Sequence, residues 1–159
     1  MVKNNLKSLL IHIIVSIISM FVFIIFNMAQ AKWASEAAAR NHHYNMMFVA
    51  VITIAVAVIS YYLLARKHLI NQGTVYNNLF SVSLTLILGV LLWANAFTMD
   101  RIGPSNHLLN SQLWQHYTMY NGYSFFILNE TGNNNPYVFL IFNFMPFMAM
   151  LSGIRSHRS

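Results

Sequence analysis

Residues 6–28 of the chain read LKSLLIHIIVSIISMFVFIIFNM, and this stretch decides the fold class. Apart from Lys7 near its start, it contains no charged side chain. At a rise of about 1.5 Å per residue, a helix of this length crosses the roughly 30 Å of bilayer hydrocarbon. A helix also pairs its backbone N–H and C=O groups internally, as lipid requires. The stretch therefore predicts a membrane-spanning helix.

The residues that follow raise the alternative of a cleaved signal peptide. The triplet Ala-Gln-Ala at 29–31 has the small-x-small form of a cleavage site. However, the preceding apolar stretch is longer than the roughly 7–15 residues of a secretory signal. The next residues are rich in alanine, with Glu36 and Arg40 one helical turn apart, and this composition favours a helix. We therefore expect the first helix to be retained and to continue beyond the bilayer surface towards Asn41.

Three further apolar runs have a length similar to the first. They lie at 46–65, 79–97 and 137–154. Asn143 and Pro146 interrupt the last run, and a helix in a bundle tolerates such a proline with a kink. The whole chain is only 8% charged, whereas soluble domains carry about 25% charged residues. We predict an all-α fold, with residues 1–159 forming a single integral membrane domain that contains a four-helix bundle.

The basic residues predict how the chain is oriented in the membrane. Six of the nine Lys and Arg fall on one side of the four-span arrangement: Lys3, Lys7, Arg66, Lys67, Arg155 and Arg158. The other three fall on the opposite side, together with all three acids: Lys32, Arg40, Arg101, Glu36, Asp100 and Glu130. Cytoplasmic loops are enriched in Lys and Arg, so both termini are expected in the cytoplasm. The short loops are typical of a bacterial cell-membrane protein.

The largest segment outside the spans, residues 98–136, is predicted to lie on the outer side. Within it, GPSNHLLNSQLWQHYTMYNG begins with Pro-Ser and ends with Asn-Gly, which are helix start and stop signals. Apolar residues recur on one face, which predicts an amphipathic helix that lies on the outer leaflet or caps the bundle. The residues expected to contact a partner or lipid are Leu109, Leu113, Trp114, Tyr117 and Tyr120.

A polar stripe marks the first span. His12, Ser16 and Ser19 recur at i, i+4 and i+7, so they share one face of the helix. Polar groups inside a membrane usually face the bundle interior and often mark function. The alternative is that these side chains only pack against a neighbouring helix through hydrogen bonds. Together with Asn95 and Asn143, they form the candidate ligand-binding set.

Small residues at helical spacing indicate which faces of the other spans point inward. Examples in the second, third and fourth runs are Ala57, Ser60, Thr85, Gly89 and Gly153. Small residues let helices approach one another closely in membranes, so packing explains them without a functional role.

Several chemistries have no support in the sequence. The absence of Cys excludes disulfides and thiolate metal sites, and the scattered basic residues give no reason to expect nucleic-acid binding. There is no Gly-rich phosphate loop and no nucleophile elbow. The histidines of the outer segments lack recognised metal-ligand spacing, so neither a metal nor a cofactor is expected: His42, His43, His107 and His116.

Three functions remain open on this evidence. The first is an accessory or regulatory membrane protein that binds another membrane protein or a second copy of itself. The second is a small-molecule carrier or channel that uses the polar stripe inside the bundle. The third is a membrane enzyme with an outer-face site built from His107, His116 and nearby acids. The lack of recognisable catalytic groups favours the first.

Overall fold

The computed structural model describes residues 1–32, 36–99, 111–124 and 135–156, without the side chains of Asn27 and residues 29–44. The described residues form helices and contain no strand. The helices are α1 (Val2–Lys32), α2 (Glu36–His68), α3 (Val75–Met99), α4 (Gln112–Tyr120), the 3-10 helix η2 (Gly122–Ser124) and α6 (Pro136–Arg155). Each of α1, α2, α3 and α6 contains a segment long and apolar enough to cross a membrane.

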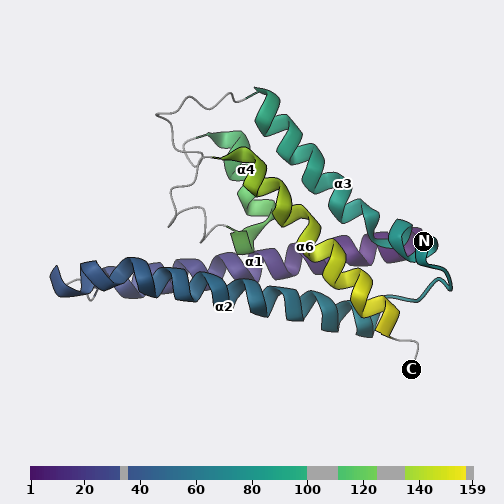
Figure 1. The fold of residues 1–159 in the computed structure, drawn as a ribbon, viewed down its shortest axis with the longest axis horizontal. Helices are drawn as coiled ribbons and strands as arrows, with labels where there is room; N and C mark the ends of the chain where they lie inside the picture. The colour runs from purple at the N-terminus through teal and green to yellow at the C-terminus, as the bar shows by residue number, and fades with distance from the viewer. Residues whose placement is uncertain (33–35, 100–110, 125–134, 157–159) are drawn as a thin grey trace.

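The four long helices form a wedge. Figure 1 shows α1 and α2 lying side by side, with α3 and α6 inclined to them. The helices converge near the end that carries both termini, which we call the terminal end, and α3 diverges from α1 and α2 towards the far end. The α4–η2 segment, residues 112–124, fills the space between them and contacts both α1 and α3. The bundle therefore holds a fifth helix inside its open side.

The boundary between α1 and α2 differs from the expectation that α1 continues towards Asn41. Helix α1 ends at Lys32 and α2 begins at Glu36, so Arg40 belongs to the start of α2. An alanine-rich composition favours a helix at each of these residues but does not say where the chain turns back. The return of α2 alongside α1 requires that turn (Figure 1).

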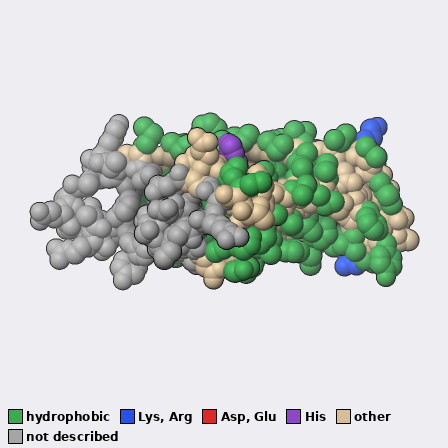
Figure 2. Space-filling model, turned by 90° about the horizontal axis from the view of Figure 1, so that it is seen from above, with side chains coloured by type: hydrophobic (Ala, Val, Ile, Leu, Met, Phe, Trp, Pro, Cys, Tyr) green, Lys and Arg blue, Asp and Glu red, His purple; other side chains and the backbone are tan. Residues whose placement is uncertain are grey.

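The terminal end carries the described basic side chains, in agreement with their expected location on one side. Figure 2 shows Lys and Arg at this end of the visible surface. Asparagines hold the start of α1 in place there. The Asn4 amide donates to the Ile70 carbonyl at 2.7 Å and accepts from the Ile70 N–H at 3.2 Å. The Asn5 amide likewise bonds two backbone groups of α3, the Phe80 carbonyl at 2.8 Å and the Leu84 N–H at 3.0 Å.

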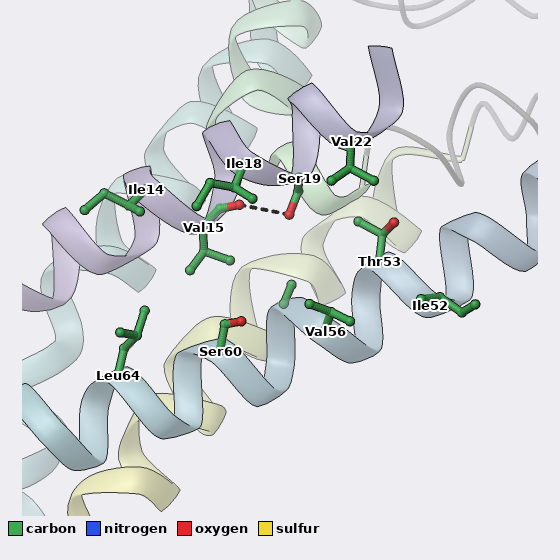
Figure 3. Close-up of a pocket in the computed structure, with 11 residues that line it drawn as sticks. Ile14, Val15, Ile18, Ser19, Val22, Ile52, Thr53, Val56, Ser60 and Leu64 are labelled. Carbon is green, nitrogen blue, oxygen red and sulfur yellow. Dashed lines mark hydrogen bonds between the residues drawn. The ribbon is translucent and has the colours of Figure 1, made fainter. Parts of the chain in front are cut away.

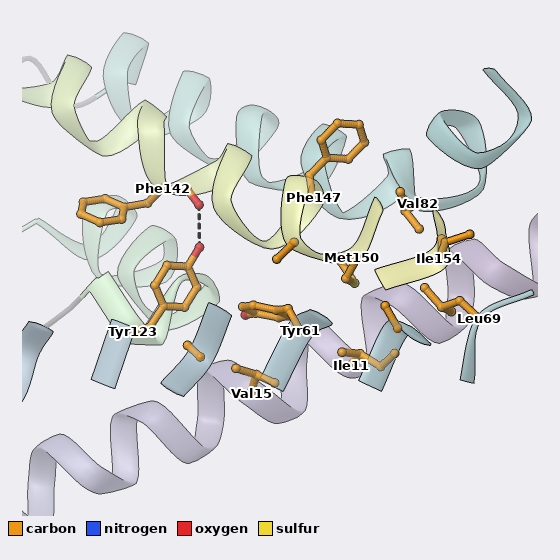
Figure 4. Packing of buried hydrophobic residues seen from close by; sticks show 13 residues of the cluster. Ile11, Val15, Tyr61, Leu69, Val82, Tyr123, Phe142, Phe147, Met150 and Ile154 are labelled. Carbon is orange, nitrogen blue, oxygen red and sulfur yellow. Dashed lines mark hydrogen bonds between the residues drawn. The ribbon is translucent and has the colours of Figure 1, made fainter. Parts of the chain in front are cut away.

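An apolar core fills the region between α1, α2 and α6 (Figure 4). Tyr61, Met150 and Ile154 in this core are at most 1% exposed. Gly153 allows α6 to lie directly on α2, because a Cβ at that position would collide with the Tyr62 carbonyl. Gly153 thus has the packing role that its spacing in the sequence predicts.

The outer faces of the long helices are covered by large apolar side chains. Ile18 of α1, Phe48 of α2, Leu91 of α3 and Ile141 of α6 are each at least 58% exposed. The middle of the bundle, in contrast, contains buried polar residues. A surface this apolar is rare on a soluble monomer and suits contact with lipid.

Candidate functional site

A stripe of buried polar side chains runs along α1 at intervals of four residues. Asn4, Ser8, His12 and Ser16 are each at most 2% exposed. Ser8 Oγ lies 3.3 Å from Thr85 Oγ1, and His12 Nδ1 lies 3.0 Å from the Tyr61 hydroxyl. The sequence-based set contained His12 and Ser16 but missed Asn4 and Ser8. The spacing of four residues extends the stripe to both, although Asn4 precedes the apolar run and Ser8 lies at its start.

The α4–η2 segment meets this stripe in the middle of the bundle. Ser16 Oγ donates to the Tyr120 carbonyl at 2.6 Å. Gly122 lies against the backbone of Ser16, where a Cβ would collide with the Ser16 carbonyl. Ser16 is near the centre of the candidate span Val2–Phe26. The α4–η2 segment therefore reaches from the far end to about half the depth of the bundle.

The apolar face of α4 points into the bundle rather than towards a surface. Trp114 and Tyr117 are at most 1% exposed and pack with Ala96 of α3 and Phe139 of α6. Leu113 is partly buried against the same cluster, while Leu109 lies outside the described residues. The amphipathic pattern predicted a helix here, but could not say whether its apolar side would meet lipid, a partner or the chain itself. In this structure it meets α3 and α6.

Three tyrosines at intervals of three residues attach the α4–η2 segment to neighbouring helices. The Tyr117 hydroxyl donates to the Phe139 carbonyl of α6. The Tyr120 hydroxyl donates to the Thr85 carbonyl of α3 at 2.8 Å. The third, Tyr123, is described next. Each phenol thereby satisfies its own hydroxyl in an apolar setting, where an unpaired hydroxyl is costly.

Tyr123 compensates for the proline inside α6. Proline has no N–H, so Pro146 cannot donate to the carbonyl four residues earlier, that of Phe142. The Tyr123 hydroxyl lies 2.5 Å from this carbonyl and supplies the missing donor (Figure 4). Helix α6 consequently remains a single helix through Pro146. The proline was expected to be tolerated with a kink, and the structure shows which side chain takes over its hydrogen bond.

Asn143 joins α6 to the tip of the same segment. It is 1% exposed, and its Oδ1 accepts from Asn121 Nδ2 at 2.9 Å. Gly89 of α3 faces the Asn143 amide closely, since a Cβ on Gly89 would collide with it. The Tyr120 ring also borders Gly89. Two glycines, Gly89 and Gly122, therefore create the space into which the segment fits.

Aromatic rings surround His12. Its ring centroid lies 4.2 Å from that of Tyr120, 5.7 Å from that of Tyr61 and 6.5 Å from that of Tyr123. Only one side of the imidazole is hydrogen-bonded, because His12 Nε2 has no partner among the described residues. The backbone of Tyr120 also lies close to the imidazole. Asn143 Nδ2 and Trp114 Nε1 are likewise buried without a partner in the described chain.

The structure brings only part of the candidate ligand-binding set together. His12, Ser16 and Asn143 all border the α4–η2 segment. Ser19 is buried as well, but its hydroxyl donates to the Val15 carbonyl of its own helix at 2.8 Å. Asn95 is exposed on α3, away from this group. The sequence did not single out Asn121 and Tyr123, because a connecting segment gave no sign that it enters the bundle.

A second feature is a groove between α1 and α2, with a volume of about 190 Å³ (Figure 3). We call it the α1–α2 groove. It is mainly aliphatic and contains three hydroxyl-bearing residues, Ser19, Thr53 and Ser60. Thr53 bonds its own helix at the Val49 carbonyl, whereas Ser60 makes no hydrogen bond within the described chain. The remaining lining residues are Ile14, Val15, Ile18, Val22, Ile52, Val56, Ala57 and Leu64.

The predicted outer-face site of histidines and acids stays a prediction. His116 is exposed on α4, and His107 lies outside the described residues. The side chains of the three acids are not described either. Within the described chain, no three His, Asp or Glu residues gather in a group suited to a metal ion.

Comparison with known proteins finds no matching family model, and no curated protein or solved structure matches the chain. Two features of the described chain could support a function. One is the polar centre, formed by His12, Ser16, Asn121 and Asn143 around Tyr120. The other is the α1–α2 groove.

The close approach at Gly89 can be tested by mutation. Gly89→Ala should destabilise the protein by about 1–3 kcal/mol, because the new methyl group collides with the Asn143 amide. In an Asn143→Ala background the same substitution should cost less, since the colliding atoms are gone. The free energy of unfolding, measured in mixed detergent micelles for the native protein, the two single variants and the double variant, gives this coupling. Equal costs in both backgrounds would contradict the contact.

Proposed function

We propose that this chain is an accessory or regulatory protein of the cell membrane that binds another integral membrane protein. In this proposal both termini lie in the cytoplasm, as the basic residues at the terminal end favour. The four long apolar helices and the apolar outer surface support insertion into a bilayer.

The α1–α2 groove is the observation that carries this proposal. Its lining extends over residues 14–22 of α1 and 52–64 of α2, or about 12 Å and 18 Å along the helices. The polar centre of the bundle, by comparison, is occupied by the chain's own α4–η2 segment. The groove is open to the outside, because Ile18 and Val56 on its rim are 58% and 55% exposed. Binding at the groove therefore needs no rearrangement of the bundle.

The chemistry of the groove favours a helix of a partner protein over a lipid chain. Small and hydroxyl-bearing residues allow close approach and hydrogen bonds between membrane helices. Ser60 presents a hydroxyl that has no acceptor within the described chain. A lipid tail offers no group to this hydroxyl, whereas a helix with Ser, Thr, Asn or Gln does. The exposed face of α3 also has large aliphatic residues such as Ile87 and Leu91, but its Ser83 hydroxyl already donates to the Phe80 carbonyl.

Site-specific photo-crosslinking in native membranes tests the proposal. A photoreactive residue at Val56 should give an adduct with one defined integral membrane protein, and the same residue at Leu91 should not. Ser60→Phe, which fills the groove one turn away, should reduce the adduct about tenfold, equivalent to about 1.4 kcal/mol of binding. The matched substitution Ser83→Phe on α3 should leave the adduct unchanged.

Three outcomes would contradict this function. Adducts at Val56 that consist only of lipid would assign the groove to an acyl chain. An adduct with twice the mass of the 18.3 kDa chain would assign the groove to a second copy of the protein. A protein adduct that survives Ser60→Phe would show that the captured protein does not bind in the groove.

A further inference from the structure

The polar centre contains buried nitrogens that require a hydrogen-bonding partner. His12 Nε2 and Asn143 Nδ2 have none among the described residues, although His12 is fully buried and Asn143 is 1% exposed. A buried polar atom left unpaired destabilises the folded protein, because it has lost its hydrogen bonds to water. In a bilayer this cost cannot be relieved by contact with bulk water.

Both side chains border the same residue of the α4–η2 segment, Tyr120. The His12 ring packs against the Tyr120 ring with centroids 4.2 Å apart. The Asn143 amide and the Tyr120 ring both face Gly89. The other atoms of these two side chains are already engaged, His12 Nδ1 by Tyr61 and Asn143 Oδ1 by Asn121. Within these two side chains, the two nitrogens are thus the polar atoms that no hydrogen bond within the described chain satisfies.

The surroundings restrict what can bind there. No Lys, Arg, Asp or Glu lies in the described chain between Ser8 and Phe26 of α1, or in α3 or the α4–η2 segment. An ion would therefore be buried without a counter-charge, which is strongly unfavourable. The close packing around Gly89 also limits the size of any ligand. An uncharged oxygen satisfies both nitrogens, because a hydroxyl or water oxygen both accepts and donates, and a carbonyl accepts.

We infer that His12 and Asn143 form a binding site beside Tyr120 for a small uncharged oxygen ligand. The ligand is water or the hydroxyl or carbonyl oxygen of a molecule only a few atoms in size. It connects α1 and α6 through the tip of the α4–η2 segment, which both helices already contact. This site is separate from the α1–α2 groove, so the inference stands independently of the proposed partner.

Solid-state NMR of the full ¹⁵N-labelled chain in lipid bilayers tests the site, with water itself as the probe. Magnetisation transferred from water protons should reach His12 Nε2 and Asn143 Nδ2. It should be undetectable at the backbone amide of Val82, a residue that is fully buried in the core. Exposed His116 provides the positive control. The side-chain nitrogen signal that disappears in His12→Phe is assigned to His12, and the one that disappears in Asn143→Leu is assigned to Asn143.

The outcomes separate the two sources of oxygen. Transfer from water to both nitrogens supports bound water. Transfer instead from carbon-bound protons that belong to neither protein nor lipid supports a co-purified small molecule. The inference is overturned if both nitrogens behave like the Val82 amide and receive no magnetisation from water or from a co-purified small molecule. It is overturned equally if all transfer to them comes from protein or lipid protons.

Discussion

Gly122→Ala is expected to lower the free energy of unfolding by about 3 kcal/mol, the upper end of typical overpacking costs. The new Cβ would collide with the Ser16 carbonyl and with the Met20 side chain. Met20 is flexible and can move, but the Ser16 carbonyl belongs to the backbone of α1 and cannot yield without bending that helix. The tip of the α4–η2 segment would have to retreat, which also strains the hydrogen bond from Ser16 to Tyr120.

Unfolding in mixed detergent micelles measures this effect, and Gly73→Asn is the matched control. Gly73 has a φ of +85° and no atom near the position of a Cβ. Asparagine tolerates this left-handed conformation better than other non-glycine residues, so the control should cost only about 1 kcal/mol. If Gly122→Ala were as mild as the control, the close contact between the segment and α1 could not exist.

Tyr123→Phe is expected to destabilise the protein by about 1–3 kcal/mol, because it leaves the Phe142 carbonyl without a donor. The ring remains, so packing against Phe142 is retained and only the hydroxyl is lost. Tyr137→Phe is the matched control, since Tyr137 is 62% exposed. It should change stability by less than about 0.5 kcal/mol, as is usual for surface substitutions.

Pro146→Ala turns this prediction into a double-mutant cycle. Alanine restores the backbone N–H that α6 lacks, and this N–H can donate to the Phe142 carbonyl. Tyr123→Phe should therefore cost less in the Pro146→Ala background than in the native chain. The coupling should lie within about 0.5–3 kcal/mol, the range for residues that share a partner. Additive effects would mean that Tyr123 does not compensate for the proline.

Much of the helical architecture could be predicted from the chain alone. Each of the four apolar runs lies within one long helix, and both the polar stripe at His12 and the small residue Gly153 face the interior. These features are local, because hydrophobic length and helical periodicity follow from neighbouring residues. The place where α1 gives way to α2 could not be found in this way, since the alanine-rich residues favour a helix on either side of the turn.

The candidate site depended on contacts between residues far apart in the chain. Neither Tyr123 nor Pro146 stands out in the sequence. Each gains its role from the hydrogen bond between the Tyr123 hydroxyl and the Phe142 carbonyl, which Pro146 leaves without a backbone donor. Asn95 resembles Asn143 in the sequence, yet it faces outward while Asn143 is buried. A one-dimensional pattern cannot distinguish an asparagine at a helix surface from one that meets another segment.

By itself, the sequence determined an all-helical chain with four apolar segments, basic residues at one end and a polar face on the first helix. The tertiary structure decided where the outer amphipathic segment goes. Its apolar face could be covered by lipid, by a partner or by the bundle, and the periodicity is the same in all three cases. The space left by Gly89 and Gly122, and the carbonyl left unpaired by Pro146, favour insertion into the bundle. These complementary features exist only when the helices are assembled.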